Sequence, residues 1–340
     1  MKRVIIEEPG KVEIQDVPDI GAEPGHALLK VLYGGICGSD MGTYNGTFLY
    51  SKYPRVPGHE FSAEVVEVDE SNPYGIKKGM IVTGNPYFNC GTCYSCRRGF
   101  VNCCTSNQTL GAQRDGIFQQ YFSMPLERIY DGKGLSPKTL AAIEPFCIGY
   151  HAVKRAGIRK GEKVLVVGAG TIGYLTAMAA KMMGGEVYVC DISQDKLDFA
   201  AGLGIAGTIL NTGDEAFKEA VQRATDGDGF DVCMEAVGMP STFQNCIDAA
   251  AYRARVVVIG VGKKSLDFFY TTIQTKELNI FGSRNAEKAD FLELIDFVKA
   301  GKADLDRIVS AVYPYTEAEK AFADLKEHGG SLVKVMLKFA

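Results

Sequence analysis

The sequence predicts an α/β protein in which a β-rich region is followed by a doubly wound parallel sheet. Residues 1–145 contain short strands between Gly, Pro, Asp and Asn turns, and they show no long helical pattern. From about Gly161 onward, apolar strands alternate with helical stretches. This alternation indicates right-handed βαβ units, whose parallel sheet is buried on both faces.

The elements of each region follow from this reading. Strands of the first region are expected at residues 4–6, 12–14, 27–32 and 64–68. The second region is expected to contain strands at 163–167, 186–190, 207–210, 230–235, 255–260 and 278–282, with helices running to 183 and at 195–203, 215–224 and 241–251. Beyond residue 284, helices at 288–299 and 316–327 precede a strand at 333–339. No helix–strand repeat resumes in this tail, so we expect it to pack back on the first domain.

Composition and charge exclude several classes of protein. The chain has 340 residues, which is enough for two domains and a sizeable core. Its net charge of −4 gives no reason to expect nucleic acid or an anionic membrane as a partner. The N-terminus reaches Glu7 and Glu8 without an apolar signal core. The uncharged run Val164–Ala180 contains three glycines, which favours a buried strand, turn and helix over a membrane span. The default expectation is a cytoplasmic protein.

Ten cysteines in a chain without an export signal indicate metal ligands or buried thiols rather than disulfides. Four of them share one short window with the spacing Cys90-x2-Cys93-x2-Cys96-x7-Cys104. Four thiolates at this spacing can close a tetrahedral zinc site with a structural role. An iron–sulfur cluster or a set of unligated thiols would be the alternatives. Because Cys103 adjoins Cys104, the spacing alone leaves the fourth ligand open.

A glycine-rich loop follows the strand at 163–167 and begins a helix, in the G-x-G-x-x-G pattern of a dinucleotide site. The loop residues expected to contact the cofactor are Gly168, Gly170, Thr171, Ile172 and Gly173. The second glycine lets backbone N–H groups approach a pyrophosphate. Asp191 follows the next strand, where its carboxylate would bind the adenosine ribose and repel a 2′-phosphate, which favours NAD over NADP. Lys196 would weaken the preference for NAD, because a cation near the ribose tolerates a phosphate. The alternative interpretation of the glycine-rich loop is a turn that binds no ligand.

A second, dispersed set of metal-ligand types consists of Cys37, His59 and a carboxylate. Cys37 alone or His59 alone would be interpreted as a residue of the core. The order in which the motifs follow one another along the chain changes that interpretation. The sequence carries Cys37-Gly38-Ser39-Asp40, then Gly58-His59-Glu60, the cysteine window, Ile143-Glu144-Pro145 and the glycine-rich loop. In this order the chain resembles the zinc-dependent medium-chain dehydrogenases, and among them the polyol and threonine dehydrogenase branch. The resemblance implies a GroES-like catalytic domain at 1–147 and 284–340, and a Rossmann domain at 148–283.

The resemblance also implies roles for individual residues. Cys37 and His59 match the catalytic zinc ligands of the family. Glu60 matches a carboxylate that ligates zinc or trades places with water, and Glu144 matches an acidic residue at the metal, bound directly or through water. Ser39 matches the hydroxyl that contacts the substrate alcohol. The family spacing also selects Cys104 as the fourth ligand of the structural site.

Other positions are less determined by the pattern. Gly42 stands where many family members have a histidine that ends the proton relay, so the proton must leave by Thr43, a ribose hydroxyl or ordered water. Arg284 is a candidate for a substrate carboxylate or the cofactor pyrophosphate, and a surface salt bridge is the alternative. Tyr44, Phe118 and Phe146 are candidates for lining the substrate pocket, although aromatic residues more often belong to the core.

The implied reaction is metal-assisted hydride transfer, with two zinc ions and NAD as cofactors. We expect oxidation of a secondary alcohol on a polyol or sugar acid, with a small-molecule substrate and a homodimer or homotetramer. L-Threonine 3-dehydrogenase is the alternative enzyme. An NAD-binding regulator without turnover is the alternative of another class, and the missing relay histidine is its only support.

Overall fold

The computed structural model describes residues 1–205, 207–262 and 264–340 and divides into two compact units. Unit 1 comprises Met1–Glu144 and Ala286–Ala340, and unit 2 comprises Pro145–Asn285. Residues 145–147 and 284–285, which the sequence assigned to the first domain, belong to unit 2. At the first boundary the chain runs within a single helix, α4 (Ile143–Ala156), so Glu144 and Pro145 are helical neighbours in different units.

Unit 1 is built on a seven-stranded sheet in the order β16-β17-β3-β4-β5-β9, with β8 also paired to β3. Its strands are β3 (His26–Ile36), β4 (Glu60–Val68), β5 (Ile81–Gly84), β8 (Tyr121–Pro125), β9 (Ile129–Asp131), β16 (Val309–Pro314) and β17 (Lys334–Lys338). Two smaller antiparallel sheets pair β1 (Lys2–Glu8) with β2 (Lys11–Asp16), and β6 (Tyr87–Phe88) with β7 (Gln108–Thr109).

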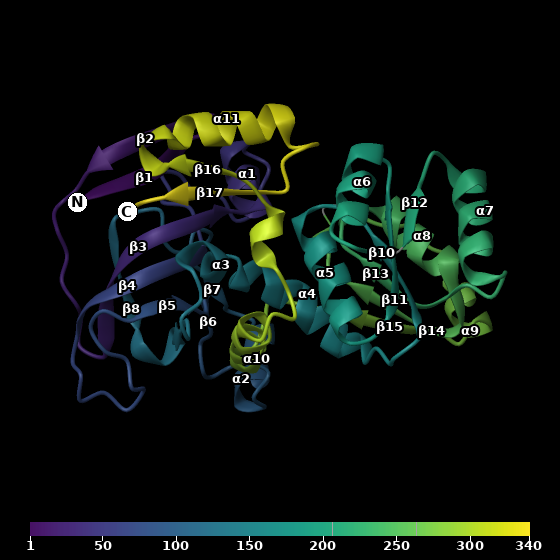
Figure 1. Ribbon diagram of the computed structural model, residues 1–340, viewed down its shortest axis with the longest axis horizontal. Helices are drawn as coiled ribbons and strands as arrows, with labels where there is room; N and C mark the ends of the chain where they lie inside the picture. Colours follow the sequence, from purple (N-terminus) through teal and green to yellow (C-terminus); the bar gives the residue numbers. More distant parts are fainter. Residues whose placement is uncertain (206, 263) are drawn as a thin grey trace. The chain divides into compact units, whose positions relative to one another are not determined.

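The tail packs back on the N-terminal region, as the sequence predicted. Strand β17 pairs antiparallel with β3, and Val335 lies opposite Ile36. Figure 1 shows the yellow C-terminal strands beside the purple β3, with both chain ends in unit 1. Strand β16, which runs parallel to β17, was not predicted. Its residues alternate between half-buried and exposed, so it lacks the continuous apolar run of a central strand.

Helices of unit 1 are few and mostly short. They are α1 (Gly38–Tyr44), α2 (Tyr94–Arg97), α3 (Pro137–Ala141), α10 (Lys288–Lys299) and α11 (Ala318–His328), with 3₁₀ turns η1 (Val101–Cys103), η2 (Leu126–Arg128), η3 (Leu305–Ile308) and η4 (Tyr315–Glu317). Helix α11 contributes Phe322 to the same apolar core as Leu29 of β3 and Phe61 of β4. This core fixes the strands from which the metal-ligand residues project.

Unit 2 contains a six-stranded parallel sheet in the order β12-β11-β10-β13-β14-β15. The strands are β10 (Lys163–Val167), β11 (Glu186–Asp191), β12 (Gly207–Leu210), β13 (Phe230–Glu235), β14 (Ala250–Val258) and β15 (Asn279–Gly282). If the six strands are numbered by their position along the chain, their order across the sheet is 3-2-1-4-5-6. This is the doubly wound arrangement, in which the direction of strand addition reverses between strands 1 and 4. The structure therefore confirms the predicted parallel sheet and locates its switch point between β10 and β13.

The helices of unit 2 connect these strands, and none of the described helices of the chain is long and apolar enough to cross a membrane. They are α4, α5 (Thr171–Met182), α6 (Gln194–Gly202), α7 (Asp214–Thr225), α8 (Pro240–Ala249) and α9 (Thr271–Thr275). The expected helix at 241–251 ends two residues early, and the expected strand at 255–260 begins at Ala250. The cause is tertiary, because Ala250 pairs with Phe230 of β13 and the Lys276 ammonium donates to its carbonyl oxygen.

An ion pair fixes the connection between α4 and β10. Arg255 of β14 places Nη2 2.6 Å from Glu162 Oε1 and donates from Nη1 to the carbonyl oxygens of Ala156 and Gly157. The main-chain N–H of Arg159 donates to the other oxygen of Glu162 at 2.8 Å. Burial alone would raise the pKa of Glu162, but the hydrogen bonds from Arg255 and Arg159 and the charge of Arg255 lower it.

The lowered pKa predicts a pH-dependent loss of stability in Glu162→Gln. The carboxylate stabilises the fold above its unfolded pKa of about 4.3, and this contribution disappears as pH falls through the lower folded value. We expect Glu162→Gln to lose about 1 kcal/mol at pH 7, a figure reduced for partial exposure, and less at pH 3. Urea denaturation at the two pH values measures the difference. Glu219→Gln, from the exposed Arg223 pair, is the control expected to change little.

Candidate metal centres and cofactor loop

Cys37, His59 and Glu60 come together at one end of the sheet of unit 1. One ligand atom from each of the three lies within 4.8 Å of the other two. Cys37 is the N-cap residue of α1, His59 immediately precedes β4, and Glu60 is its first residue. The structure thus brings together three donors that are separated in sequence: a thiol, an imidazole and a carboxylate.

Asp40 holds the two ligand segments together. Its carboxylate accepts a hydrogen bond from the main-chain N–H of Cys37 at 2.9 Å and another from the main-chain N–H of Gly58 at 3.0 Å. Asp40 is 1% exposed, so both segments are fixed by a buried acceptor. Sequence reasoning included Asp40 in a motif without giving it a role. The available signal was an acid in the first turn of a helix that begins at a ligand.

Lys334 is a second residue that sequence reasoning missed. Its ammonium donates to both oxygens of Glu60, at 2.8 and 2.7 Å, and to the carbonyl oxygen of Ile36 at 3.2 Å. Lys334 and Glu60 are both buried. Gly35 lies opposite Glu60 in the β3–β4 pair, and a Cβ there would meet Oε2 at 2.0 Å, so only glycine leaves room for the carboxylate. The available signal was a lysine at the start of the apolar run at residues 335–337 in the terminal strand.

Glu144 lies in the first turn of α4 and is also buried. The Tyr87 hydroxyl donates a hydrogen bond to Glu144 Oε1. Burial raises the pKa of Glu144 to about 7; the negative charge of Glu60 adds to this, and the charge of His59 opposes it. Glu144 is not among the three residues whose ligand atoms lie within 4.8 Å of one another, although it interacts electrostatically with two of them.

The donor set and its charge both fit a zinc ion. Sulfur, imidazole nitrogen and carboxylate oxygen are the donors that zinc takes in proteins. Acidic groups outnumber basic ones here, the acids being Cys37, Asp40, Glu60 and Glu144 and the bases His59 and Lys334. Burial lowers the pKa of His59, but the charge and hydrogen bond of Cys37, together with the charges of Asp40 and Glu144, outweigh burial and raise the pKa well above its usual range. His59 Nδ1 is buried and has no hydrogen-bond partner among the described residues.

The predicted substrate contacts are not all brought to this centre. Ser39 lies half-buried on α1, two residues after Cys37. Tyr44 and Phe118 lie in the core of unit 1, where Tyr44 packs 5.4 Å from the ring of Phe322. Phe146 is fully buried in unit 2. Arg284 is exposed and follows β15.

The four window cysteines form the second metal-ligand group. One sulfur from each of Cys90, Cys93, Cys96 and Cys104 lies within 4.8 Å of the others. Cys103 is exposed and is not part of this group. The main-chain N–H of Cys90 donates to Cys104 Sγ at 3.3 Å, and bonds of the same kind from Cys96 and Thr105 lower the pKa of Cys93 to about 5. Such N–H groups favour thiolates, the form that binds metal.

The glycine-rich loop connects β10 to α5 at the switch point of the sheet of unit 2. The main-chain N–H of Ala169 donates to Asp191 Oδ2 at 2.7 Å, and that of Ser193 donates to Oδ1 at 3.0 Å. A Cβ on Gly173 would lie 1.8 Å from the Gly168 carbonyl oxygen, so helix and strand can pack this closely only with glycine there. A Cβ on Gly170 would meet nothing within 4 Å. The space beside Gly170 is therefore open to a ligand.

The other predicted cofactor residues lie around this loop. Thr171, Ile172 and Gly173 form the first turn of α5, whose N-terminus attracts anions. Lys196 lies in α6, and its carbonyl oxygen accepts a hydrogen bond from the Tyr174 hydroxyl at 2.7 Å. The loop, the helix N-terminus and Asp191 together fit a dinucleotide.

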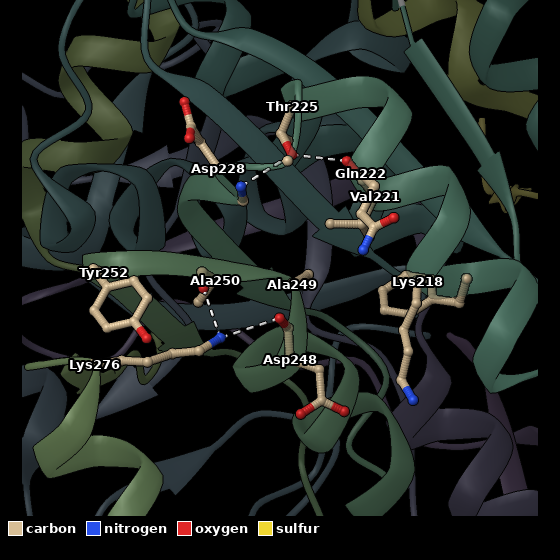
Figure 2. A pocket seen from close by; sticks show the side chains of 13 residues that line it. Lys218, Val221, Gln222, Thr225, Asp228, Asp248, Ala249, Ala250, Tyr252 and Lys276 are labelled. Atoms are coloured by element: carbon tan, nitrogen blue, oxygen red, sulfur yellow. Dashed lines mark hydrogen bonds between the residues drawn. The ribbon is translucent and has the colours of Figure 1, made fainter.

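A cavity of about 190 Å³ in unit 2 lies at the opposite end of the sheet, beside the starts of β13 and β14. Figure 2 shows Lys276 pointing toward the end of α8. Its ammonium donates to the carbonyl oxygens of Ile247, Asp248 and Ala250 at 3.0, 3.2 and 2.8 Å. An ammonium has three donors, so this lysine stabilises the helix end and leaves no donor for a ligand.

Comparison with known proteins decides the family. Residues 23–133 match the alcohol dehydrogenase GroES-like domain, and residues 171–300 match the zinc-binding dehydrogenase family. The L-galactonate-5-dehydrogenase of Escherichia coli strain K12 is 33% identical over 313 residues, which cover 92% of each chain. The chain belongs to the zinc-dependent medium-chain dehydrogenases. Within them it lies in the polyol branch, and the sorbitol dehydrogenase of Halalkalibacterium halodurans is 32% identical over 333 residues, covering 96% of each chain.

The comparison with solved structures agrees. An alcohol dehydrogenase from Escherichia coli CFT073, solved with NADH, superposes with a TM-score of 0.91 at 28% identity, covering 100% of this chain and 99% of the other. This medium-chain dehydrogenase therefore has a GroES-like and a Rossmann-type unit, with zinc and a nicotinamide dinucleotide as cofactors. It is an NAD(P)-linked alcohol dehydrogenase. The predicted family, fold class, enzyme class and cofactors are confirmed.

The neighbouring cysteines provide a test of the closed site in this dehydrogenase. We expect Cys104→Ser to lower the zinc content by about one ion per chain, because a four-thiolate site loses a ligand. Cys103→Ser is the matched control and should leave zinc content and thermal stability unchanged. Metal analysis of the purified proteins measures both. The reverse pattern would assign the fourth ligand to Cys103.

Proposed function

We propose that the protein oxidises a secondary alcohol of a polyol or sugar acid to the ketone, reversibly, with transfer of a hydride to NAD. The observation that carries this proposal is the donor group in unit 1, where one thiol and one imidazole stand with the carboxylate of Glu60, and the buried carboxylate of Glu144 interacts electrostatically with His59 and Glu60. Carboxylates make a more polar centre than a second thiolate would, and this suits a substrate with many hydroxyls. The names of the relatives, L-galactonate-5-dehydrogenase and sorbitol dehydrogenase, support the same substrate class.

The proposed roles follow the arrangement of side chains. Cys37 and His59 hold the catalytic zinc, with Glu60 or Glu144 as a further ligand, directly or through water. Zinc supplies Lewis-acid stabilisation of the negative charge that develops on the alcohol oxygen. Ser39 takes the proton of the alcohol.

For proton exit we propose a route through Thr43 in place of the usual histidine, with Gly42 at that position. Thr43 lies one helical turn after Ser39, and its hydroxyl donates to the Ser39 carbonyl oxygen at 3.2 Å. It also accepts a hydrogen bond from the Ser51 hydroxyl at 3.2 Å. For a proton to leave along this pair, both hydroxyls must rotate so that Thr43 donates to Ser51 and Ser51 donates onward to water.

On the cofactor side, we propose that Asp191 binds the ribose hydroxyls and that the loop from Gly168 to Gly173 binds the pyrophosphate. Both oxygens of Asp191 already accept one main-chain N–H, but a carboxylate has about four acceptor positions and can take the ribose as well. Its charge disfavours a 2′-phosphate. Arg284 remains a proposed contact for an anionic group of the cofactor or the substrate.

We also propose a homodimer or homotetramer and a cytoplasmic location. Strand β15 is the last strand of the sheet of unit 2 and presents an edge on which a second copy could pair. All ten cysteines are free, a state favoured by a reducing compartment.

A substrate panel tests the reaction. With zinc-loaded protein and NAD, we expect NADH formation with polyols or sugar acids, including sorbitol and L-galactonate, and little with L-threonine. Ser39→Ala should lower kcat about 100-fold, since general acid–base groups contribute that much. The loss of activity in Ser39→Ala would show that the measured turnover comes from this protein and not from a contaminating enzyme. Fastest turnover of L-threonine would favour the threonine 3-dehydrogenase alternative, and no turnover of any compound would favour the regulator.

The Asp191→Asn variant tests the coenzyme preference. Removing one negative charge near the ribose should raise the ratio of kcat/KM for NADP to that for NAD about tenfold, because a like charge at close range disfavours the phosphate by more than 1 kcal/mol. Asparagine keeps the shape of the side chain and can still accept from Ala169. An unchanged ratio would remove Asp191 from cofactor selection.

A further inference from the structure

The loop that carries the four cysteines is anchored at its base by a residue of the other metal centre. Strands β6 and β7 pair antiparallel, with Tyr87 opposite Thr109, and the intervening residues include all four cysteines. The Tyr87 side chain is buried, and its hydroxyl donates a hydrogen bond to Glu144 Oε1. The short strand that closes the cysteine loop therefore also supplies the hydrogen-bond donor to a carboxylate of the catalytic centre.

Arg128 binds this base from the side. Its guanidinium donates from Nη1 to the Tyr87 carbonyl oxygen at 2.6 Å and from Nη2 to Asn89 Oδ1 at 2.8 Å. Its Cζ also lies 4.6 Å from the centre of the Phe88 ring. The Arg128 side chain is only 12% exposed, so one largely buried guanidinium contacts the three successive residues Tyr87, Phe88 and Asn89.

Asn89 continues the connection into the sulfur cluster. Its Nδ2 donates to Cys96 Sγ at 3.7 Å, while its Oδ1 accepts from Arg128. The next residue, Cys90, is itself one of the four sulfur donors. Hydrogen bonds thus lead from Cys96 through Asn89 and Arg128 to the main chain of Tyr87, and the side chain of Tyr87 continues the path to the carboxylate of Glu144.

We propose that Tyr87 is a positioning residue for Glu144 and that Arg128 couples its position to the folded cysteine loop. Glu144 is not in the group of ligand atoms formed by Cys37, His59 and Glu60, and the phenol holds one of its oxygens. Tyr87 therefore determines how Glu144 is presented to a metal at that centre. The four-cysteine zinc site then stabilises its own loop and, through these contacts, also fixes the position of Glu144 at the catalytic centre. This inference rests on the proposed function, since Glu144 matters only where it acts beside the catalytic metal.

The deletion of one hydroxyl tests the positioning role. With zinc kept in the four-cysteine site and Co²⁺ exchanged into the catalytic site, Tyr87→Phe should shift the d–d absorption of Co²⁺, because the Glu144 carboxylate changes its position relative to the metal. We expect kcat to fall roughly tenfold or more, the effect typical of hydrogen-bond partners behind a metal site, with KM for NAD unchanged. Metal content should stay at the wild-type value.

Tyr313→Phe is the matched control. Its hydroxyl also donates to a carboxylate, Asp324, at 2.7 Å in the same unit, and neither residue belongs to either metal-ligand group. We expect this variant to leave the Co²⁺ spectrum and kcat unchanged. A Co²⁺ spectrum that Tyr87→Phe also leaves unchanged overturns the positioning role.

The coupling to the cysteine loop is tested from the other end. Arg128→Lys keeps the charge but cannot hold Tyr87 and Asn89 together, so it should shift the Co²⁺ spectrum in the same direction as Tyr87→Phe. Combined with Tyr87→Phe it should add no further shift, because both changes interrupt one path. If Arg128→Lys does not fold, Asn89→Ala interrupts the path on the loop side.

The outcomes separate the two proposals. A spectrum that moves in Tyr87→Phe but not in Arg128→Lys or Asn89→Ala overturns the coupling and leaves Tyr87 acting on Glu144 alone. If Co²⁺ does not bind at Cys37 and His59 in the wild-type protein, the proposed function fails, whatever the variants do.

Discussion

Two main-chain N–H groups, those of Cys37 and Gly58, meet at the buried carboxylate of Asp40, and the catalytic centre depends on this meeting. A buried carboxylate costs free energy unless hydrogen bonds satisfy it. Here both oxygens are satisfied by groups on the two segments that carry the thiol and the imidazole. The residue that lowers the cost of its own burial therefore also fixes the distance between two metal ligands.

The three buried carboxylates at and beside the catalytic ligand group are stabilised in three different ways. Asp40 accepts from main-chain N–H groups, Glu60 from the ammonium of Lys334, and Glu144 from the hydroxyl of Tyr87. A cation holds a carboxylate charged more strongly than a neutral phenol does. Glu60 thus belongs to a buried ion pair, whereas the hydrogen-bond donor to Glu144 is a neutral phenol. This difference makes Glu144 the more adjustable of the two carboxylates near the metal ligands.

Sequence reasoning predicted most of unit 2 because its signals are local. Apolar runs bounded by glycines gave β10, β12 and β13 with the bounds that the structure has. The cysteine spacing and the order of motifs likewise indicated the two ligand groups before any contact was known. What could not be predicted depends on contacts between distant parts of the chain. The early start of β14 requires Lys276, and the partners of Glu60 and Glu144 are brought in by β17 and β6. No periodicity in the sequence reports such pairings.

The pairing of Lys334 with Glu60 has a consequence for how the protein is made. The two residues are 274 positions apart. At translation rates of about 5–20 residues per second, Glu60 is synthesised roughly 14 to 55 s before its counter-ion. During that interval the start of β4 cannot adopt its buried arrangement without leaving a carboxylate uncompensated. The nucleotide-binding unit lies entirely between the two residues, so it can fold on the ribosome while the catalytic centre waits for strand β17.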